Sequence, residues 1–343
     1  MYNISDLSKD FEILFKSNED ISLDTISTPS VPIENSIIFI KNNKYLNEFE
    51  NYCKNNKKIN NLCIVIDKLF FETINDDCLL KTPGKYCDIL ALTENIEIST
   101  SKLSKEVSSL VDNKLNDVVD GRQMGTCNID PTAVIAQNVF IGEGVTIEAD
   151  VQIFSGVVIM SNSTIGKETI LFPNVTVYRN TQIGENVRIH SGSTIGSDGF
   201  GYNFDGKEHL KVWHLGNVKI ENNVEIGSNT CIDRGAFGTT KIGEGTKIDN
   251  IVQVGHNCNI GKYVILCGQV GIGGSVTIGD YTVLGGAAKI VPGVVIGKKC
   301  QLAGGCVVTN SLEDDSKVGG HPARPIKDWM RSIATLRKLS SRK

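Results

Sequence analysis

The feature of this chain that most limits its fold is a six-residue repeat of branched aliphatic residues through its second half. The repeat is unbroken over residues 129–195, resumes over 220–232 and continues over 242–308. In a parallel β-helix each short strand supplies one inward aliphatic residue, so a hexapeptide period is its signature. Glycine often follows the aliphatic residue, as at Gly142, and we expect it there for a corner with unusual φ and ψ. The sequence therefore predicts a mainly β protein built on a parallel β-helix.

The repeat covers only part of the 343 residues, so further domains are expected on both sides of it. Residues 1–100 alternate apolar, strand-like runs with polar, helix-compatible stretches, which is typical of a small α/β domain. A charged stretch with helical apolar spacing predicts a connecting helix and linker over 101–128. The β-helix is placed at 129–310, and a C-terminal helical extension at 311–343, where Trp329 and Leu336 recur at helical spacing.

Composition excludes several classes of protein. The ten cysteines contain no C-x-x-C pair and no zinc-like spacing, so we interpret them as small buried thiols in a reducing cytosol. The first residues have acidic side chains where a signal peptide needs a positive start. No stretch approaches the ~20 apolar residues of a membrane span. We therefore expect a cytoplasmic protein with no transmembrane segment.

Charge is distributed unevenly along the chain. The net charge of −4 argues against nucleic-acid binding, for which a basic stripe is expected. Residues 317–343, in contrast, carry eight Lys and Arg residues against Asp328 alone. A basic C-terminal element suits an acidic partner, because opposite fields speed encounter. The alternative interpretation is a solvated helix face.

The repeat is interrupted twice, at residues 196–219 and at 233–241. The first interruption is rich in glycine and aromatic residues and contains His209 and His214. Loops on a rigid scaffold commonly carry function, so we expect binding residues in these segments. Whether either histidine positions a substrate stays open at this point.

His256 is the residue with the clearest catalytic potential. Three hexads make one coil of a triangular solenoid, so Gly274, eighteen residues later, is expected on the same face of the next coil. Neighbouring coils lie about 4.8 Å apart, and an imidazole beside an exposed amide N–H is suited to acyl transfer. Asp249, seven residues before His256, is a candidate to hold the imidazole tautomer. The alternative is a polar residue on an exposed face with Gly274 as a turn glycine.

Three motifs carry a resemblance to a known family: IGSDGFGY at 195–202, VEIGSNTCIDRGA at 224–236 and KIDNIVQVGHN at 247–257. With these residues the chain resembles UDP-3-O-acylglucosamine N-acyltransferase, the family that adds the second acyl chain in bacterial lipid A synthesis. The resemblance implies transfer of a 3-hydroxylated acyl group from acyl carrier protein to the 2-amine of UDP-3-O-acylglucosamine. It implies no metal and no tightly bound cofactor, because the donor brings its own phosphopantetheine.

The resemblance also implies roles for residues of the solenoid. His256 matches the family's catalytic base, Gly274 its oxyanion donor and Asp249 the carboxylate near the base. There is one departure: some members have a second histidine one coil further on, where this chain has Gly293. The family further implies a homotrimer with active sites between neighbouring β-helices, and coils that wind left-handed.

In the N-terminal domain, Phe39, Asn42 and Tyr45 match an F-x-x-N-x-x-Y pattern that grips the uracil of the nucleotide in the family. The chemistry fits, since two aromatic rings can sandwich a base while an amide supplies a donor and an acceptor. Considered without the family, Phe39 is equally interpretable as strand core.

Three other functions are weighed against this one. An acetyl-CoA-dependent nucleotide-sugar N-acetyltransferase would use a similar base, but the basic C-terminal helix and the F-x-x-N-x-x-Y pattern favour a carrier protein and a nucleotide. An enzyme that O-acylates UDP-N-acetylglucosamine is disfavoured, because it shares only the repeat. A non-catalytic scaffold predicts that replacing His256 has no effect.

Overall fold

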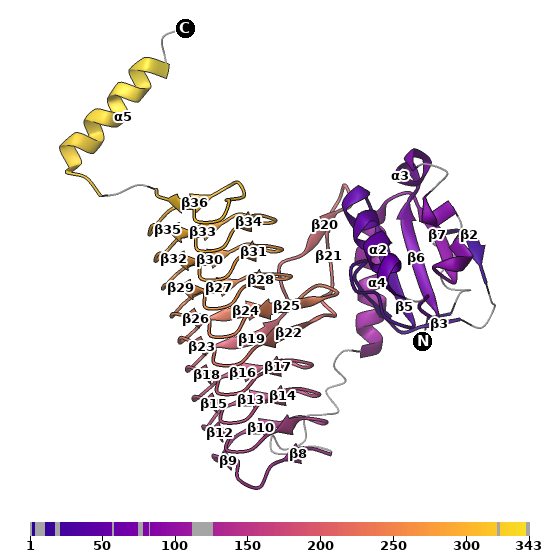
Figure 1. The fold of residues 1–343 in the computed structure, drawn as a ribbon, viewed down its shortest axis with the longest axis horizontal. Helices are drawn as coiled ribbons and strands as arrows, with labels where there is room; N and C mark the ends of the chain where they lie inside the picture. The colour runs from indigo at the N-terminus through magenta and orange to yellow at the C-terminus, as the bar shows by residue number, and fades with distance from the viewer. Residues whose placement is uncertain are drawn as a thin grey trace.

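The computed structural model describes residues 2–3, 11–17, 21–56, 58–74, 78–81, 83–111, 126–320 and 323–340. Figure 1 shows an N-terminal α/β domain, a long solenoid of stacked coils and a C-terminal helix, α5 (Ile326–Ser340). Residues 112–125 of the expected linker and 341–343 of the basic tail lie outside the described residues.

The N-terminal domain is a five-stranded sheet in the order β2-β7-β6-β5-β4. The β2–β7 pair is antiparallel and the other neighbours are parallel. A short antiparallel pair, β1–β3, lies outside this sheet. The strands of the domain are β1 (Tyr2–Asn3), β2 (Glu12–Lys16), β3 (Ser22–Leu23), β4 (Thr25–Ile26), β5 (Ser36–Ile40), β6 (Leu62–Asp67) and β7 (Ile89–Thr93).

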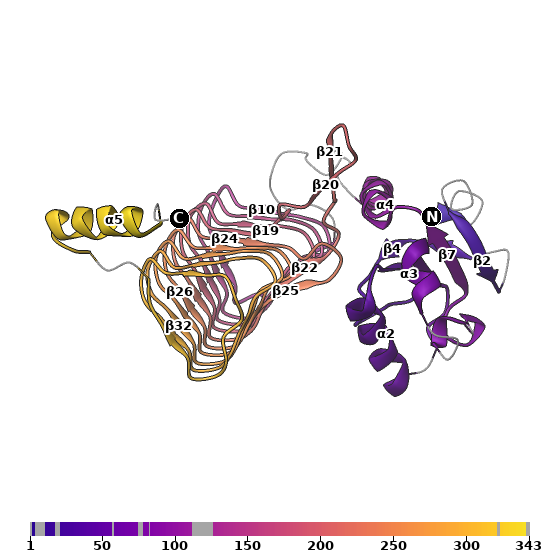
Figure 2. The same ribbon diagram turned by 90° about the horizontal axis from the view of Figure 1, so that it is seen from above.

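Helices cover both faces of this sheet (Figure 2). Ile37 packs in one core cluster with Leu103 of α4, whereas the neighbouring Ile38 packs in another with Leu46 and Phe49 of α2. A strand buried on both faces needs a continuous apolar run, which explains the sequence of β5. The helices are α2 (Asn43–Asn55), α3 (Lys68–Thr73) and α4 (Ile96–Val111), with 3₁₀ turns η1 (Leu79–Lys81) and η2 (Pro83–Lys85).

The solenoid consists of three parallel sheets, and each coil contributes one strand to each sheet. Sheet 1 contains β10 (Phe140–Ile141), β13 (Val158–Ile159), β16 (Thr176–Val177), β19 (Thr194–Ser197), β24 (Cys231–Asp233), β27 (Gln253–Val254), β30 (Gly271–Ile272), β33 (Lys289–Ile290) and β36 (Val307–Val308). Sheet 2 contains β8 (Asn128–Ile129), β11 (Thr146–Ile147), β14 (Thr164–Ile165), β17 (Gln182–Ile183), β22 (Asn217–Ile220), β25 (Thr239–Ile242), β28 (Asn259–Ile260), β31 (Thr277–Ile278) and β34 (Val295–Ile296). Sheet 3 contains β9 (Val134–Ile135), β12 (Gln152–Ile153), β15 (Ile170–Leu171), β18 (Arg188–Ile189), β23 (Glu225–Ile226), β26 (Lys247–Ile248), β29 (Ile265–Leu266), β32 (Val283–Leu284), β35 (Gln301–Leu302) and β37 (Lys317–Val318).

The repeated aliphatic residues point inward and stack from coil to coil. Ile232 pairs with Val254, which pairs with Ile272, and all three are buried. A side chain at each such position contacts its equivalents above and below, so one continuous core runs along the solenoid. The predicted parallel β-solenoid and N-terminal α/β domain are confirmed.

The glycines that directly follow the aliphatic residues were expected to adopt unusual φ and ψ at a corner. This expectation is wrong, apart from Gly196. The left-handed corner residue lies three positions after the inward residue, as at Gly144 (φ 67°) and Asn162 (φ 57°). Gly166 instead lies where coils approach closely, because an added Cβ would be 2.5 Å from the backbone of Gly184 in the next coil. At such positions the small size of glycine matters, and not its φ.

The solenoid extends beyond the expected limit at residue 310. Its last strand, β37, pairs Val318 with Leu302, and Leu312 forms a bridge to Ile296. The step from Val308 to Leu312 is four residues instead of six. Because of this shorter step, a strict hexapeptide period does not predict the final strand.

The first interruption of the repeat folds into a hairpin, β20 (Tyr202–Phe204) and β21 (His209–Lys211), that packs against α4. Asn203 Nδ2 donates to Glu97 O and Ser101 Oγ, both at 2.8 Å. Trp213 N donates to Ser104 Oγ at 3.1 Å. The insertion therefore joins the N-terminal domain to the middle of the solenoid, as Figure 1 shows.

Candidate active site

His256 lies at the corner between sheets 1 and 2, two residues after the inward Val254 of β27. We call this the His256 corner. The pairing of Val254 with Ile272 brings Gly274 of the next coil beside the imidazole. A Cβ added to Gly274 would lie 2.5 Å from His256 Nε2. The absence of a side chain at Gly274 thus leaves the space in front of Nε2 open.

The tautomer of His256 is set by the next residue in the chain. His256 Nδ1 lies 2.8 Å from Asn257 Oδ1, and that oxygen also accepts the backbone N–H of Ala236 at 3.0 Å. Because this atom accepts a backbone N–H, it is the amide oxygen of Asn257 and not the amide nitrogen. Nδ1 of His256 must therefore carry the proton and donate it to that oxygen. Nε2 therefore carries the lone pair and faces Gly274, as a general base requires. The sequence analysis missed Asn257, although it directly follows His256.

The Gly274 amide is available to a ligand. The neighbouring amides are used inside the solenoid, since Gly273 N donates to Ile290 O and Ser275 N to His256 O. No hydrogen bond found among the described residues uses the Gly274 N–H. A free backbone N–H beside the lone pair of an imidazole supplies the two functions that acyl transfer needs.

His214, at the end of the insertion, packs against the catalytic candidate. Its ring is 1% exposed and meets the His256 ring edge-on, with centroids 5.1 Å apart. His214 Nδ1 donates to Val212 O at 2.9 Å. Burial, and secondly the nearby His256, lower the pKa of His214 from 6.5 to about 4. His214 is therefore neutral at pH 7 and holds His256 by packing. The exposed His209 contacts Phe204 instead.

A cavity of about 810 Å³ opens in front of His256. Residues of the insertion form one wall of this cavity, and residues of four successive coils form the other. Gly293 lies at its far end, with φ 77° and nothing within 4 Å of an added Cβ. The space that a second histidine occupies in some members of the resembling family is open here. The polar or aromatic residues around the cavity are Asp198, Phe200, Tyr202, Lys211, Asp233, Gln253, His256 and Ser275.

A second cavity, of about 270 Å³, connects the N-terminal domain to the same histidine. Phe39 and Tyr45 line it together with Phe237, His256 and Asn257. The rings of Phe39 and Phe237 are 6.5 Å apart. Two of the three residues expected to hold a uracil therefore face a cavity that reaches the candidate base.

Asn42 has a different environment from Phe39 and Tyr45. It is the N-cap of α2, where its Oδ1 accepts from Lys44 N at 3.0 Å and Tyr45 N at 3.4 Å. It is exposed and does not line the cavity. The cap consumes its acceptor, so only the Nδ2 donor is left for a ligand.

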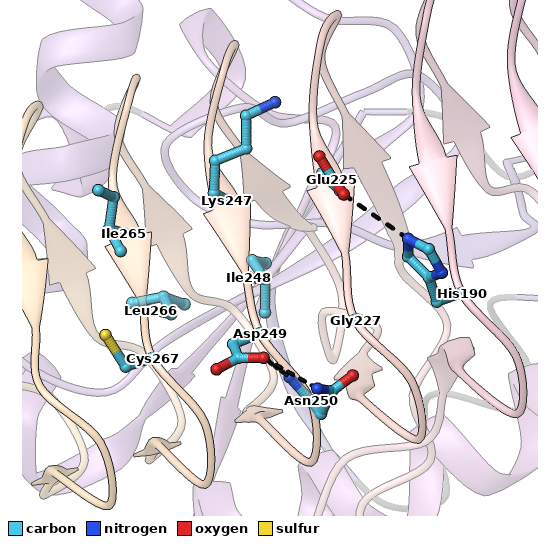
Figure 3. A pocket seen from close by; sticks show the side chains of 10 residues that line it. All are labelled: His190, Glu225, Gly227, Lys247, Ile248, Asp249, Asn250, Ile265, Leu266 and Cys267. Carbon is cyan, nitrogen blue, oxygen red and sulfur yellow. Dashed lines mark hydrogen bonds and ion pairs between the residues drawn. The ribbon is translucent and has the colours of Figure 1, made fainter.

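Asp249 lies at a different corner, between sheets 3 and 1, which we call the Asp249 corner. Its Oδ2 accepts from Gly268 N at 2.9 Å, and its Oδ1 from Asn250 N at 2.7 Å. It lines a groove of about 500 Å³ together with Cys267, His190 and Glu225, as Figure 3 shows. His190 Nε2 and Glu225 Oε1 are 3.6 Å apart. No group of metal-binding side chains is found here or elsewhere among the described residues. Within one chain, Asp249 does not contact His256, and Asn257 orients the ring.

Comparisons with known proteins agree with the motifs. A UDP-3-O-acylglucosamine N-acyltransferase of Methylobacterium sp. (strain 4-46) is 40% identical over 147 residues, which is 43% of this chain and 42% of that protein. One from Helicobacter hepaticus is 45% identical over 146 residues, or 42% of this chain and 44% of that protein. The chain is similar to UDP-3-O-acylglucosamine N-acyltransferases. The resemblance is confirmed, and the match spans about two fifths of the length of these curated relatives.

A family model and two solved structures also match parts of this chain. The family model of the GMPPB C-terminal domain matches residues 123–199. Among solved structures, UDP-N-acetylglucosamine acyltransferase of Francisella novicida is 26% identical, with a TM-score of 0.48, over 60% of this chain and 73% of that chain. The Campylobacter jejuni enzyme of that name is 24% identical, with a TM-score of 0.43, over 63% of this chain and 85% of that chain.

Proposed function

We propose that this chain is an N-acyltransferase that moves a 3-hydroxyacyl group from acyl carrier protein to the 2-amine of UDP-3-O-acylglucosamine, in lipid A biosynthesis. The observation that carries the proposal is the arrangement at His256, whose Nε2 lies beside Gly274, a residue with an unused backbone N–H. The names of the curated relatives supply the acceptor, and the resemblance described above implies the acyl donor.

In the proposed reaction the acceptor amine attacks the thioester carbonyl carbon. His256 Nε2 takes a proton from the amine as the C–N bond forms, and Asn257 holds the ring in the tautomer that can do so. The carbonyl oxygen becomes an oxyanion and accepts the Gly274 N–H. When the C–S bond breaks, the imidazolium returns its proton to the sulfur, and the thiol of the donor leaves.

The N-terminal domain is proposed to hold the nucleotide. Phe39 and Tyr45 line the cavity of about 270 Å³ that reaches His256, and aromatic rings bind a uracil by stacking. Asn42 contributes its Nδ2 donor to a carbonyl of the base. This places the uridine end of the acceptor on one side of His256 and leaves the cavity of about 810 Å³ for the sugar and acyl groups.

The C-terminal helix is proposed to meet the acyl carrier protein. α5 carries Lys327, Arg331, Arg337 and Lys338, and none of its residues is buried. An exposed basic helix is complementary to an acidic partner. No helix among the described residues has the length and apolar composition of a membrane span. A homotrimer in the cytoplasm completes the proposal.

The test is acyl transfer from 3-hydroxyacyl carrier protein to UDP-3-O-acylglucosamine, with acetyl-CoA as the competing donor. We expect His256→Ala to lower kcat by about 10²–10⁴-fold, the usual contribution of a general base. His209→Ala is the matched control, because this exposed histidine packs on Phe204 in the hairpin and lines neither cavity. Turnover with acetyl-CoA and none with the carrier protein would favour the acetyltransferase. An active His256→Ala variant would contradict the mechanism.

A further inference from the structure

A carboxylate with no cationic partner lies beside the candidate base. Asp233 ends strand β24, one coil before His256, and both residues line the cavity of about 810 Å³. Gln253 Nε2 donates to Asp233 Oδ2 at 2.9 Å, and Ser197 Oγ donates to Oδ1 at 3.4 Å. Among the described residues no Lys or Arg forms an ion pair with it. The sequence analysis did not single out this residue.

The surroundings of Asp233 make its charge costly. Burial, and to a smaller extent the neighbouring Asp198, raise its pKa above the usual 3.8, against the hydrogen bonds and His256, which lower it. Lys211, which lines the same cavity, is paired with Asp198 at 2.6 Å. A partly buried carboxylate without a cation is unfavourable unless a charged ligand completes the pair.

The location of Asp233 indicates which cation is missing. The pairing of Ile232 with Val254 places Asp233 level with Gly255, the residue before His256. The adjoining coil then presents His256, so a group held by Asp233 is within about one coil spacing, roughly 4.8 Å, of the base. In the proposed function, the group that must reach this point is the acceptor amine, which takes up a proton near neutral pH.

We propose that the Asp233 carboxylate binds the protonated amine of the acceptor and thereby selects an amino sugar over its 2-hydroxyl counterpart. This inference rests on the proposed function and names the residue that sets acceptor specificity. One ammonium proton passes to water and the second goes to His256 as the C–N bond forms. His256 then protonates the departing sulfur, so the products are the amide, the thiol and one proton.

The test is binding of two ligands, UDP-3-O-acylglucosamine and the matching UDP-3-O-acylglucose, to the full-length protein by calorimetry. At pH 6, wild type should prefer the amine by about 10- to 100-fold, the range of a charge-assisted hydrogen bond. Asp233→Asn keeps an acceptor for Gln253 but loses the charge, so the preference should vanish while affinity for the hydroxyl ligand stays within about threefold. Asp280→Asn, a carboxylate on another corner, is the matched control and should keep the wild-type preference.

The pH dependence separates a charge effect from a structural one. Above the pKa of the amine, the preference of wild type for the amine ligand over the hydroxyl ligand should disappear. The relative affinity of Asp233→Asn for the two ligands should not depend on pH. The ionisable groups coupled to Asp233 are Asp198, Cys231, His256 and Cys258, and Lys211 pairs with Asp198. The experiment is therefore repeated in His256→Ala to remove the imidazole.

The failures are distinguishable. If Asp233→Asn keeps the amine preference, or loses affinity for both ligands equally, the inference is wrong while the proposed function stands. If wild type binds neither ligand and transfers no acyl group, both are wrong.

Discussion

The His256 corner and the Asp249 corner are made from the same hexapeptide repeat, yet they differ in what covers them. At the His256 corner, the insertion folds back over the coils and His214 packs against the imidazole. At the Asp249 corner, residues of successive coils alone line the groove (Figure 3). The comparison teaches that the repeat supplies a uniform frame, and that a non-repeating segment adds to one corner side chains, such as His214, that the repeat does not supply.

The largest expected effect is on stability and should be the same at both corners. Ile272→Ala beneath the His256 corner and Leu266→Ala beneath the Asp249 corner each remove a buried side chain. Each should lower the free energy of unfolding by about 2–5 kcal/mol, measured by urea denaturation. The control is Ile265→Ala on the same strand as Leu266, which is 43% exposed and should change stability by about 0.5 kcal/mol or less. A large loss at one corner only would contradict a uniform frame.

The second prediction concerns the enclosure of the His256 corner. Because the pKa of His214 is lowered from 6.5 to about 4, the unfolded chain binds a proton there at a higher pH than the folded chain does. Stability should therefore fall as the pH decreases from about 6.5 to about 4, by about 3 kcal/mol from this residue. Unfolding measured across this range should be less pH-dependent in His214→Gln. Parallel curves for the two proteins would show that His214 is not enclosed.

The third prediction concerns the orientation of His256. Asn257→Ala removes the acceptor for Nδ1–H, so the ring loses its preferred tautomer and kcat should fall by about 10²-fold with little change in KM. Asn257→Asp keeps an acceptor at the same place and should recover most of this loss. Steady-state kinetics of the two variants provide the measurement. An equal loss in both would mean that the side chain acts only in folding.

The repeat made the solenoid predictable because each coil repeats the same local contacts. The N-terminal domain was predictable for a similar reason, since strands such as β5 are continuous apolar runs. The eighteen-residue step also located Gly274 beside His256, because the repeat is unbroken between them. These features depend on neighbours in the sequence or on a constant period.

Other features depend on segments where the period changes. The step between stacked residues is 37 from Ile195 to Ile232 and 22 from Ile232 to Val254. A fixed step of eighteen residues therefore does not predict that Asp233 and His214 lie near His256. The packing of His214 against His256 requires the insertion to fold back, which no local pattern encodes. The role of Asn257 depends on its contact with Ala236, across the second interruption.

The smallest expected effect tests the Asp249 corner itself. Asp249 accepts hydrogen bonds from Gly268 and Asn250 and lies away from His256 of its own chain. Asp249→Asn retains an acceptor for these amides, so kcat should fall by less than about tenfold, or 1.4 kcal/mol. A loss as large as that of Asn257→Ala would instead place Asp249 beside the His256 of a neighbouring copy. Mixing Asp249→Asn with His256→Ala distinguishes these outcomes, because only sites shared between copies would regain activity in mixed assemblies.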